Sequence, residues 1–325
     1  MEETIKKIFA EGKGILAADA RIKGMSKRLE EAGVEGTPEN ALKFREILFN
    51  TGGINAFISG VILNDDTIRS SVDGKSVSQI LEGKEIVPII KVDGGTEPFS
   101  DGQEEVTTGL EGLGTRLKEY FGMGVRAAKW RAVIKITDTY PSDPFLEENL
   151  GRMVQYAKLC QENGIAPIVE PEVLLDGNHT TTRCELVETK VLQTLFDKLK
   201  SENVDLTKLI LKTSMVLPGK DSGVKAEPLE VANATLRTLR NSVPSEVSGI
   251  VFLSGGQTAD EATNNLNEII KLKGDAPWQI SFSYERALQG EALETWKGKD
   301  ENIAEVQKAF YTRAEKVSKA RKGEL

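Results

Sequence analysis

Histidine is almost absent from this sequence, and cysteine is scarce. The 325 residues contain one histidine, His179, and two cysteines, Cys160 and Cys184. A histidine-rich zinc site is therefore excluded, and a serine–histidine triad would have to use that one histidine. His179 follows the turn-like segment 176–178, which predicts a solvated side chain. The cysteines fall within expected helices at no metal-binding spacing, so we expect reduced thiols and no metal site.

Long apolar runs are also missing. No stretch approaches the roughly 18 uninterrupted apolar residues of a membrane span, and the start Met1-Glu-Glu-Thr lacks the basic and apolar regions of a signal peptide. The formal charge of −8 disfavours nonspecific binding to nucleic acid or to anionic membranes. We therefore expect a cytoplasmic protein with no nucleic-acid or membrane partner.

What is present is an alternation of short apolar strands with amphipathic helical segments. Pro228 lies near an expected helix start, and Gly33 and Gly164 lie near expected helix ends. The pattern predicts eight strands, at 14–19, 54–63, 86–92, 127–134, 167–173, 209–215, 249–254 and 278–284, with helices that include 145–163 and 184–204. Eight such units predict an α/β fold, a (β/α)8 TIM barrel forming one domain over 1–325, with an open doubly wound sheet as the alternative. Residues 300–325 predict a last helix followed by a basic tail.

Polar residues recur near the ends of these strands. Lys212 stands in Leu-Ile-Leu-Lys-Thr-Ser-Met, where an isolated lysine would be explained as a snorkelling or strand-end side chain. The two-residue spacing of Lys129 with Arg131, and of Glu170 with Glu172, puts each pair on one face of its strand. In a barrel, chemistry is confined to the C-terminal ends of the strands. We therefore expect one mouth lined by Asp19, Lys91, Lys129, Arg131, Glu170, Glu172, Lys212, Ser254 and Ser283, although each of these could also belong to an ion pair at the rim.

A lysine in such a mouth can act as a nucleophile. A neighbouring ammonium such as Lys129 disfavours a second positive charge, and partial burial acts in the same direction, so the neutral amine of Lys212 is favoured. A free amine attacks a ketone to form an imine, whose iminium nitrogen accepts electrons when the neighbouring carbon–carbon bond breaks. With so little histidine in the chain, carboxylates and lysines must carry the proton transfers.

Two glycines, Gly255 and Gly256, follow Ser254 at the seventh strand, and Arg286 follows Ser283 at the eighth. Loops seven and eight of barrels often hold phosphate through backbone amides. A glycine pair alone would equally suit a simple turn. Together with Arg286, it favours a phosphorylated ligand.

The ordered set of motifs resembles the class I, Schiff-base-forming fructose-1,6-bisphosphate aldolases. It spans nearly the whole chain and consists of Gly-Ile-Leu-Ala-Ala-Asp at 14–19, Ile-Lys-Val-Asp at 90–93, Ala-Lys-Trp-Arg at 128–131, Ile-Val-Glu-Pro-Glu at 168–172, Leu-Lys-Thr-Ser-Met-Val at 211–216, Phe-Leu-Ser-Gly-Gly-Gln at 252–257 and Phe-Ser-Tyr-Glu-Arg-Ala-Leu-Gln at 282–289. The resemblance implies a metal-independent lyase without a cofactor. It also implies a homotetramer that acts on a phosphorylated sugar in glycolysis and gluconeogenesis, giving dihydroxyacetone phosphate and glyceraldehyde 3-phosphate.

The resemblance also implies a role for each site residue. Lys212 forms the imine, Glu170 is the acid–base for its formation with Glu172 beside it, Lys129 assists, and Asp19 takes the C4-hydroxyl proton. In the family, the C1 phosphate is bound by the loops after the last two strands, which here implies Ser254, Gly255, Gly256, Ser283 and Arg286. The C6 phosphate would be bound by Lys91 and Arg131.

Some residues depart from the family pattern. The family commonly has hydroxyl side chains after the first-strand aspartate, whereas this chain has Ala-Arg-Ile-Lys-Gly at 20–24. Arg21 and Lys23 either replace those hydroxyls with charge or are solvated residues at a helix start. Glu285 stands where the family usually has glycine beside the C1 phosphate, and an anion there is unfavourable unless it points away. A different acceptor, such as a seven-carbon bisphosphate or a monophosphate, and a catalytically silent barrel that serves as a scaffold remain alternatives.

Overall fold

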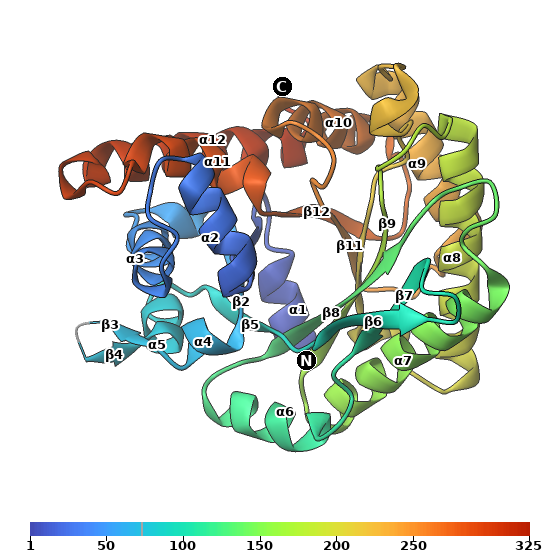
Figure 1. The fold of residues 1–325 in the computed structure, drawn as a ribbon, viewed down its shortest axis with the longest axis horizontal. Coiled ribbons are helices and arrows are strands. Elements are labelled where there is room, and N and C mark those ends of the chain that lie inside the picture. Colours follow the sequence, from blue (N-terminus) through green and yellow to red (C-terminus); the bar gives the residue numbers. More distant parts are fainter. Residues whose placement is uncertain (73) are drawn as a thin grey trace.

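The protein is a closed barrel of parallel strands surrounded by helices (Figure 1). The computed structural model describes residues 1–72 and 74–325. Within these residues, eight strands close in the order β1-β12-β11-β10-β9-β8-β5-β2, which confirms the expected (β/α)8 barrel. The barrel strands are β1 (Gly14–Ala17), β2 (Ile58–Leu63), β5 (Val87–Lys91), β8 (Ala127–Ile134), β9 (Ala166–Val173), β10 (Ile210–Thr213), β11 (Gly249–Phe252) and β12 (Gln279–Tyr284).

Several expected strands are shorter in the structure. The range 54–63 was wrong at its start, because Ile54–Ala56 forms a 3-10 helix, η1, before β2 begins. The ranges 14–19 and 209–215 were too long at their ends, because β1 ends at Ala17 and β10 at Thr213. Past β1, Asp19 lines the mouth of the barrel, and past β10 the Ser214 hydroxyl donates to the Val173 carbonyl at 2.8 Å. The sequence pattern did not predict the hairpin strands β3 (Ser71–Val72), β4 (Lys75–Ser76), β6 (Gly95–Phe99) and β7 (Glu104–Thr108).

Most of the helices cover the outside of the barrel (Figure 1). They are α1 (Glu2–Ile8), α2 (Ile22–Glu31), α3 (Pro38–Phe49), α4 (Asp65–Ile68), α5 (Val77–Glu82), α6 (Leu113–Gly122), α7 (Asp143–Glu162), α8 (Thr181–Ser201), α9 (Pro228–Ser242), α10 (Ala259–Leu272), α11 (Arg286–Trp296) and α12 (Ile303–Lys322), with 3-10 helices η2 (Leu206–Lys208), η3 (Lys220–Ser222) and η4 (Asp300–Asn302). Within the residues that the structure describes, no helix is long and apolar enough to cross a membrane.

The expected basic tail is instead the last turn of α12. Lys319, Arg321 and Lys322 all lie inside the helix, and a left-handed Gly323 ends it. Cations in a final turn are favourable because they face the negative end of the helix dipole. Arg321 also donates to backbone carbonyls next to α1 and β1, including Phe9 O at 2.8 Å. The end of α12 therefore packs against the base of the barrel.

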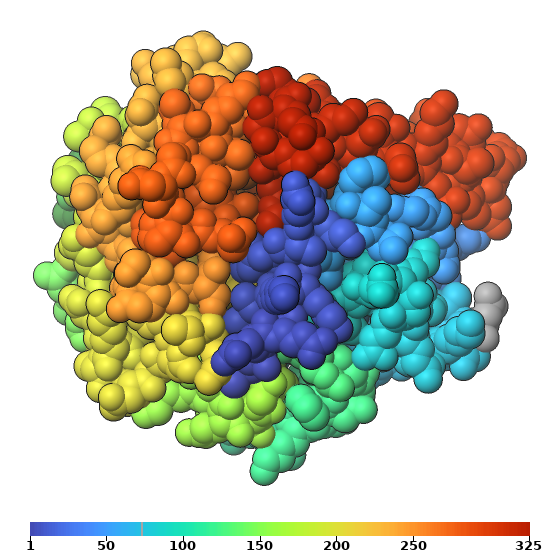
Figure 2. Space-filling view, turned by 180° about the vertical axis from the view of Figure 1, so that it is seen from behind, coloured from blue at the N-terminus to red at the C-terminus, as the bar shows by residue number. Residues whose placement is uncertain are grey.

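Helix α1 plugs the N-terminal end of the barrel. Its residues Ile5 and Ile8, with Phe9, pack against inward-facing apolar side chains such as Ile62. A Cβ on Gly249 would lie 2.3 Å from the Phe9 ring, so only glycine admits this plug. Figure 2 shows the N-terminal residues in dark blue at the middle of this face. With this end filled, the opposite end of the barrel is the one open to a substrate.

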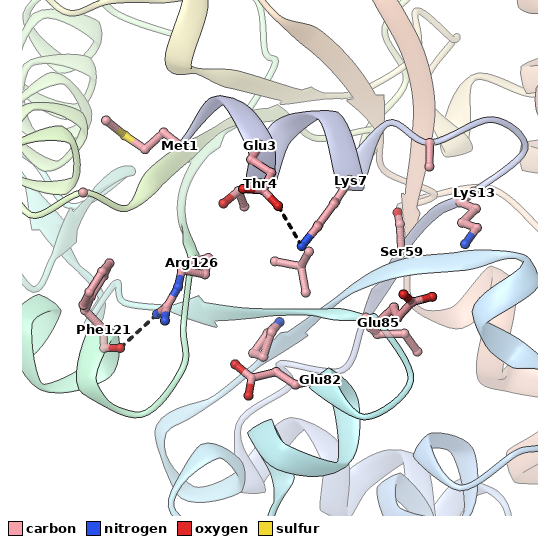
Figure 3. A pocket seen from close by; sticks show the side chains of 15 residues that line it. Met1, Glu3, Thr4, Lys7, Lys13, Ser59, Glu82, Glu85, Phe121 and Arg126 are labelled. Carbon is pink, nitrogen blue, oxygen red and sulfur yellow. Dashed lines mark hydrogen bonds and ion pairs between the residues drawn. The ribbon is translucent and has the colours of Figure 1, made fainter.

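A cavity of about 690 Å³ lies beside the plug, between α1, β5 and α6 (Figure 3). Its charged side chains interact locally: Lys7 pairs with Glu3 at 3.2 Å, and Arg126 donates to the Phe121 carbonyl at 3.0 Å. The smaller pocket at the mouth, of about 330 Å³, contains the buried ionic residues. The cavity beside α1 is the larger of the two, but the buried ionic residues lie in the mouth pocket. The mouth pocket is therefore the candidate active site.

Candidate active site

The mouth pocket gathers residues from strands that are distant in sequence. It is formed at the C-terminal ends of the barrel strands, where β1 and β12 also pair and close the barrel. Its lining includes the expected residues Asp19, Lys91, Lys129, Arg131, Glu170, Glu172, Lys212, Ser254, Gly255, Ser283 and Arg286. Gly256 lies in a neighbouring pocket of about 390 Å³, close to Leu175. Within the described part of the chain, no three His, Cys, Asp or Glu residues are grouped as a metal-binding set.

A continuous chain of charges crosses the pocket. Lys212 Nζ lies 3.0 Å from Glu170 Oε1, and Lys129 Nζ lies 3.1 Å from Glu170 Oε2. Lys129 Nζ also lies 2.8 Å from Asp19 Oδ2. The side chains of Lys212, Glu170 and Lys129 are 5%, 4% and 3% exposed, so water screens these contacts little. The arrangement places an amine, a carboxylate and a fixed cation within contact of one another.

The electrostatics of this chain keep its carboxylates ionised. Burial by itself raises the pKa of Asp19, but Lys129, Lys212 and Lys91 outweigh it and hold that pKa well below its usual range. Glu170 follows the same balance: burial raises its pKa, and Lys129 and Lys212 lower it further than burial raises it. Burial lowers the pKa of Lys129, yet Asp19 and Glu170 raise it above its ordinary value. Lys129 is therefore a permanent cation between two anions.

A second set of ion pairs lies toward β5 and β8. Arg131 pairs with Glu172, and Lys91 Nζ lies 3.3 Å from Asp93 Oδ1. Burial lowers the pKa of Lys91 despite this partner. Asp93 was missed as a site residue by sequence reasoning. Its two-residue spacing from Lys91 was the available signal, because this spacing puts both side chains on one face.

The opposite side of the pocket is built from the loops after β11 and β12. A Cβ on Gly255 would lie 2.9 Å from Glu172 Oε1, so a larger residue would displace that carboxylate. Within the described residues, the buried Ser283 hydroxyl has no hydrogen-bond partner in the protein. An unpartnered buried hydroxyl is costly unless a ligand uses it. The end of β12 therefore presents a hydroxyl without a protein partner to the pocket.

Glu285 does not leave an unpaired anion beside this region. It forms an ion pair with Arg28 of α2, and both residues line the pocket next to Arg286. Burial lowers the pKa of the Arg28 guanidinium, and the nearby positive charge of Arg286 lowers it further. Sequence reasoning missed Arg28. The seven-residue spacing from Arg21, about two helical turns, could have placed both arginines on one side of α2.

A buried acid lies behind the strand that carries Lys212. Thr213, the next residue of β10, donates its hydroxyl hydrogen bond to Glu188 of α8. Burial raises the pKa of Glu188 to about 8, and Glu172 adds to the increase, while the Thr213 bond opposes it. Lys212 and Thr213 point to opposite sides of β10 because successive residues of a strand alternate. Glu188 therefore contacts the outer side of the strand whose inner side bears Lys212.

The expectation that His179 is solvated was wrong. The side chain is 8% exposed, and burial lowers its pKa, with Arg183 contributing. The loop after β10 packs over this residue, and Gly219 N donates to the His179 carbonyl at 2.8 Å. The turn signal at 176–178 was local and contained no information about that second loop. Cys160 and Cys184 are buried free thiols within α7 and α8.

Fold and pocket together define a (β/α)8-barrel enzyme whose mouth holds a buried lysine among carboxylates. The family model described as "Fructose-bisphosphate aldolase class-I" matches residues 1–325. The chain therefore belongs to the class I fructose-bisphosphate aldolase family, which makes it a metal-independent lyase.

Curated relatives and a solved structure agree with this assignment. The chain is 46% identical over 314 residues to "Fructose-bisphosphate aldolase 4, cytosolic" of Arabidopsis thaliana, covering 96% of this chain and 80% of that protein. It is 44% identical over 317 residues to "Probable fructose-bisphosphate aldolase class 1" of Xanthomonas campestris pv. campestris, covering 97% and 95%. An aldolase structure from Plasmodium falciparum, solved in complex with TRAP and a small-molecule inhibitor, superposes with a TM-score of 0.96 at 41% identity, covering 99% and 94%.

Proposed function

We propose that Lys212 is the amine that forms the imine with the ketone of fructose 1,6-bisphosphate. One observation carries the proposal: Lys212 is buried at the mouth, with its Nζ 3.0 Å from Glu170 Oε1. That contact provides a proton acceptor in hydrogen-bond reach of the amine. A neutral amine and a carboxylic acid result when the proton passes from Lys212 to Glu170. The amine is then free to add to a carbonyl.

Each later step balances with groups present in the pocket. The nitrogen adds to C2 and passes one of its protons to the former carbonyl oxygen, which gives the carbinolamine. The carbinolamine hydroxyl then takes a second proton from Glu170 and leaves as water, which gives the iminium. Loss of the C4-hydroxyl proton to a base breaks the C3–C4 bond, and its electron pair flows to the iminium nitrogen. Glyceraldehyde 3-phosphate departs and leaves an enamine. Protonation at C3 and addition of water then release dihydroxyacetone phosphate and restore the Lys212 amine.

The neighbouring charges suit these steps. Asp19, whose pKa is held low, is the base for the C4-hydroxyl proton. Lys129 remains charged and stabilises the carboxylates on either side of it. Glu172, paired with Arg131, lies beside Glu170 and keeps Arg131 oriented toward the pocket. Preorganised charges of this kind act without reorganisation during the reaction.

The two phosphates use opposite sides of the mouth. Ser254, Gly255, Ser283 and Arg286 bind the phosphate on C1 through hydroxyls, a close backbone approach and a guanidinium. Lys91 and Arg131 face the phosphate on C6. Gly256 is left out of this set because it lines the neighbouring pocket.

Mass measurement after trapping tests the proposal. The protein is incubated with dihydroxyacetone phosphate and borohydride, which reduces an imine to a stable amine, and then digested. The expected adduct is on Lys212, and Lys212→Ala should lose both adduct and turnover. Lys23→Ala, an exposed lysine near the same rim, is the matched control and should retain both. A folded wild-type protein with no adduct would point instead to a silent barrel.

The names of relatives bear on the cellular setting. Relatives are named cytosolic in Arabidopsis thaliana and a cytoplasmic isozyme in Spinacia oleracea, which supports a cytoplasmic place in glycolysis and gluconeogenesis. A homotetramer rests on the family resemblance. Light scattering of the purified protein tests this assembly, and a monomeric mass would contradict it.

A further inference from the structure

Strand β10 leaves its neighbour β9 just before it reaches Lys212. The pairing of its backbone with β9 ends at Leu211, which lies opposite Val169. On the other side, the pairing with β11 continues to Thr213. Lys212 nevertheless holds its amine 3.0 Å from Glu170, which belongs to β9. The end of β10 therefore needs contacts other than the β9 ladder to keep this distance.

The two residues after Lys212 supply such contacts through their hydroxyls. Thr213 donates to Glu188 Oε1 of α8, on the outside of the barrel (Figure 1). Ser214 donates to the Val173 carbonyl of β9 at 2.8 Å. Thr213 and Glu188 are each 1% exposed, so water does not replace their hydrogen bond if one partner is removed. This bond joins the strand end that carries Lys212 to a helix.

A carboxyl group at position 188 is an unfavourable choice for filling space alone. Burying a polar group costs stability that an apolar side chain does not, and within the described residues Glu188 Oε2 has no hydrogen-bond partner. Burial raises the pKa of Glu188 to about 8, and Glu172 of β9 adds to the increase. Burial also raises the pKa of the nearby Cys184 thiol on α8, to about 12. Glu188 is therefore neutral at neutral pH, and its distinguishing feature is an oxygen that accepts from Thr213.

We propose that Glu188 is a positioning residue for imine formation, which holds the Lys212 amine in place through Thr213. The inference rests on the proposed function, because it takes Lys212 to be the imine-forming residue. Glu188 is not among the residues that line the mouth pocket, so it acts through the strand and not on the substrate. A reacting group misplaced by about 1 Å can lose on the order of 100-fold in rate. The proposed phosphate-binding residues lie on other strands and loops, so substrate binding should be independent of this contact.

Three variants separate the hydrogen bond from its contribution to stability. Thr213→Val removes the hydroxyl and leaves a buried carboxyl without its donor, which should lower the midpoint of urea unfolding. Adding Glu188→Leu makes both partners apolar, which is nearly neutral for stability. Glu188→Gln keeps an oxygen acceptor for Thr213. The rate of imine formation is measured by rapid mixing with dihydroxyacetone phosphate, quenching into borohydride after increasing times, and weighing the Lys212 peptide.

Imine formation should be slowed about 10- to 100-fold in both Thr213→Val and the double variant, although their urea midpoints differ. Glu188→Gln should form the imine at close to the wild-type rate at neutral pH. The inhibition constant of inorganic phosphate should be unchanged in all three. Ser59→Ala is the matched control: it removes another buried strand hydroxyl, which donates to the Ile8 carbonyl at 2.6 Å at the opposite end of the barrel, and it should keep the wild-type rate of imine formation.

A wild-type rate in the double variant would overturn the proposal, because the hydrogen bond would then serve stability alone. So would a rate that follows the urea midpoint across all variants, Ser59→Ala included. If the double variant does not fold, Thr213→Ser, which keeps the hydroxyl, is compared with Thr213→Val, and equal rates in these two reject the role of Glu188. Failure of the proposed function is distinct, since folded wild-type protein would then give no adduct on Lys212.

Discussion

Lys212 and Lys129 hold opposite oxygens of one carboxylate, that of Glu170, at 3.0 and 3.1 Å. The shared anion allows two ammonium groups to approach each other inside a pocket that excludes most water. When Glu170 accepts the proton of Lys212, the negative charge between the two lysines is removed together with one of the positive charges. The net charge of the trio is the same before and after the transfer. Proton transfer here therefore does not leave an additional buried charge.

Replacing Glu170 tests this relationship. In Glu170→Gln the amide cannot accept a proton from Lys212, and both lysines lose their shared anion. Since general acid–base catalysis contributes about 10²- to 10⁴-fold, we expect kcat for fructose 1,6-bisphosphate cleavage to fall by that amount. Glu294→Gln, on an exposed position of α11, should keep the wild-type rate. Full activity in Glu170→Gln would mean that another group takes the proton.

The Glu285–Arg28 pair should weaken anion binding near Arg286. The Glu285 charge neutralises one of two adjacent guanidiniums, so Glu285→Gln should make that region more positive. A partly exposed charge at this range is worth on the order of 1 kcal/mol, and we expect inorganic phosphate to inhibit the variant about five times more strongly. Competition assays against fructose 1,6-bisphosphate give the inhibition constant. Weaker inhibition would instead show that Glu285 orients Arg28 for phosphate.

Glu188 should make stability depend on pH. Its pKa is about 8 in the folded protein against 4.5 ordinarily, so the folded state binds the proton more tightly. The stabilisation is complete below pH 4.5 and is lost as pH rises through 8, because in this range unfolding releases the proton that the folded state holds on Glu188. Glu188→Gln should remove this pH dependence. Its free energy of unfolding near pH 8 should exceed that of the wild type by on the order of a few kcal/mol, since each unit of pKa shift corresponds to about 1.4 kcal/mol.

Urea unfolding of wild type and Glu188→Gln at a series of pH values from 5 to 9 measures the difference. The two free energies of unfolding should diverge as pH rises. Parallel curves would show that Glu188 titrates normally. Because Thr213 keeps a hydrogen-bond acceptor in the amide, the variant should retain the position of β10.

Removing metal ions should not affect the reaction. The proposed chemistry uses an amine and carboxylates, and every charge in the chain from Lys212 to Asp19 is balanced by a protein group. We expect the same cleavage rate before and after dialysis against EDTA. A rate that falls in EDTA and returns with added zinc would contradict this mechanism.

The strand pattern predicted the barrel better than it predicted the strand ends. The prediction for β8, residues 127–134, agrees with the structure at both ends. The prediction for β10 ran past Thr213, since the apolar pattern does not show where the hydrogen-bonded ladder stops. Hairpin β6–β7 was missed because its strands are short, β6 is largely exposed, and the buried residues of β7 are mostly polar, so neither strand shows alternating apolar residues. The burial of His179 depends on a loop about 40 residues further along the chain, which a local turn signal cannot report.

By itself, the sequence determined the family, the barrel and the identities of the ionic residues at its mouth. Alternating spacing and strand-end position place those residues together in any closed parallel barrel. Only the tertiary structure decided which charge faces which. Lys129 lies between Asp19 and Glu170, Glu285 meets Arg28, and Arg21 reaches across to the end of β5. These contacts join residues up to 257 positions apart, and they depend on barrel closure and side-chain reach, which no local pattern encodes.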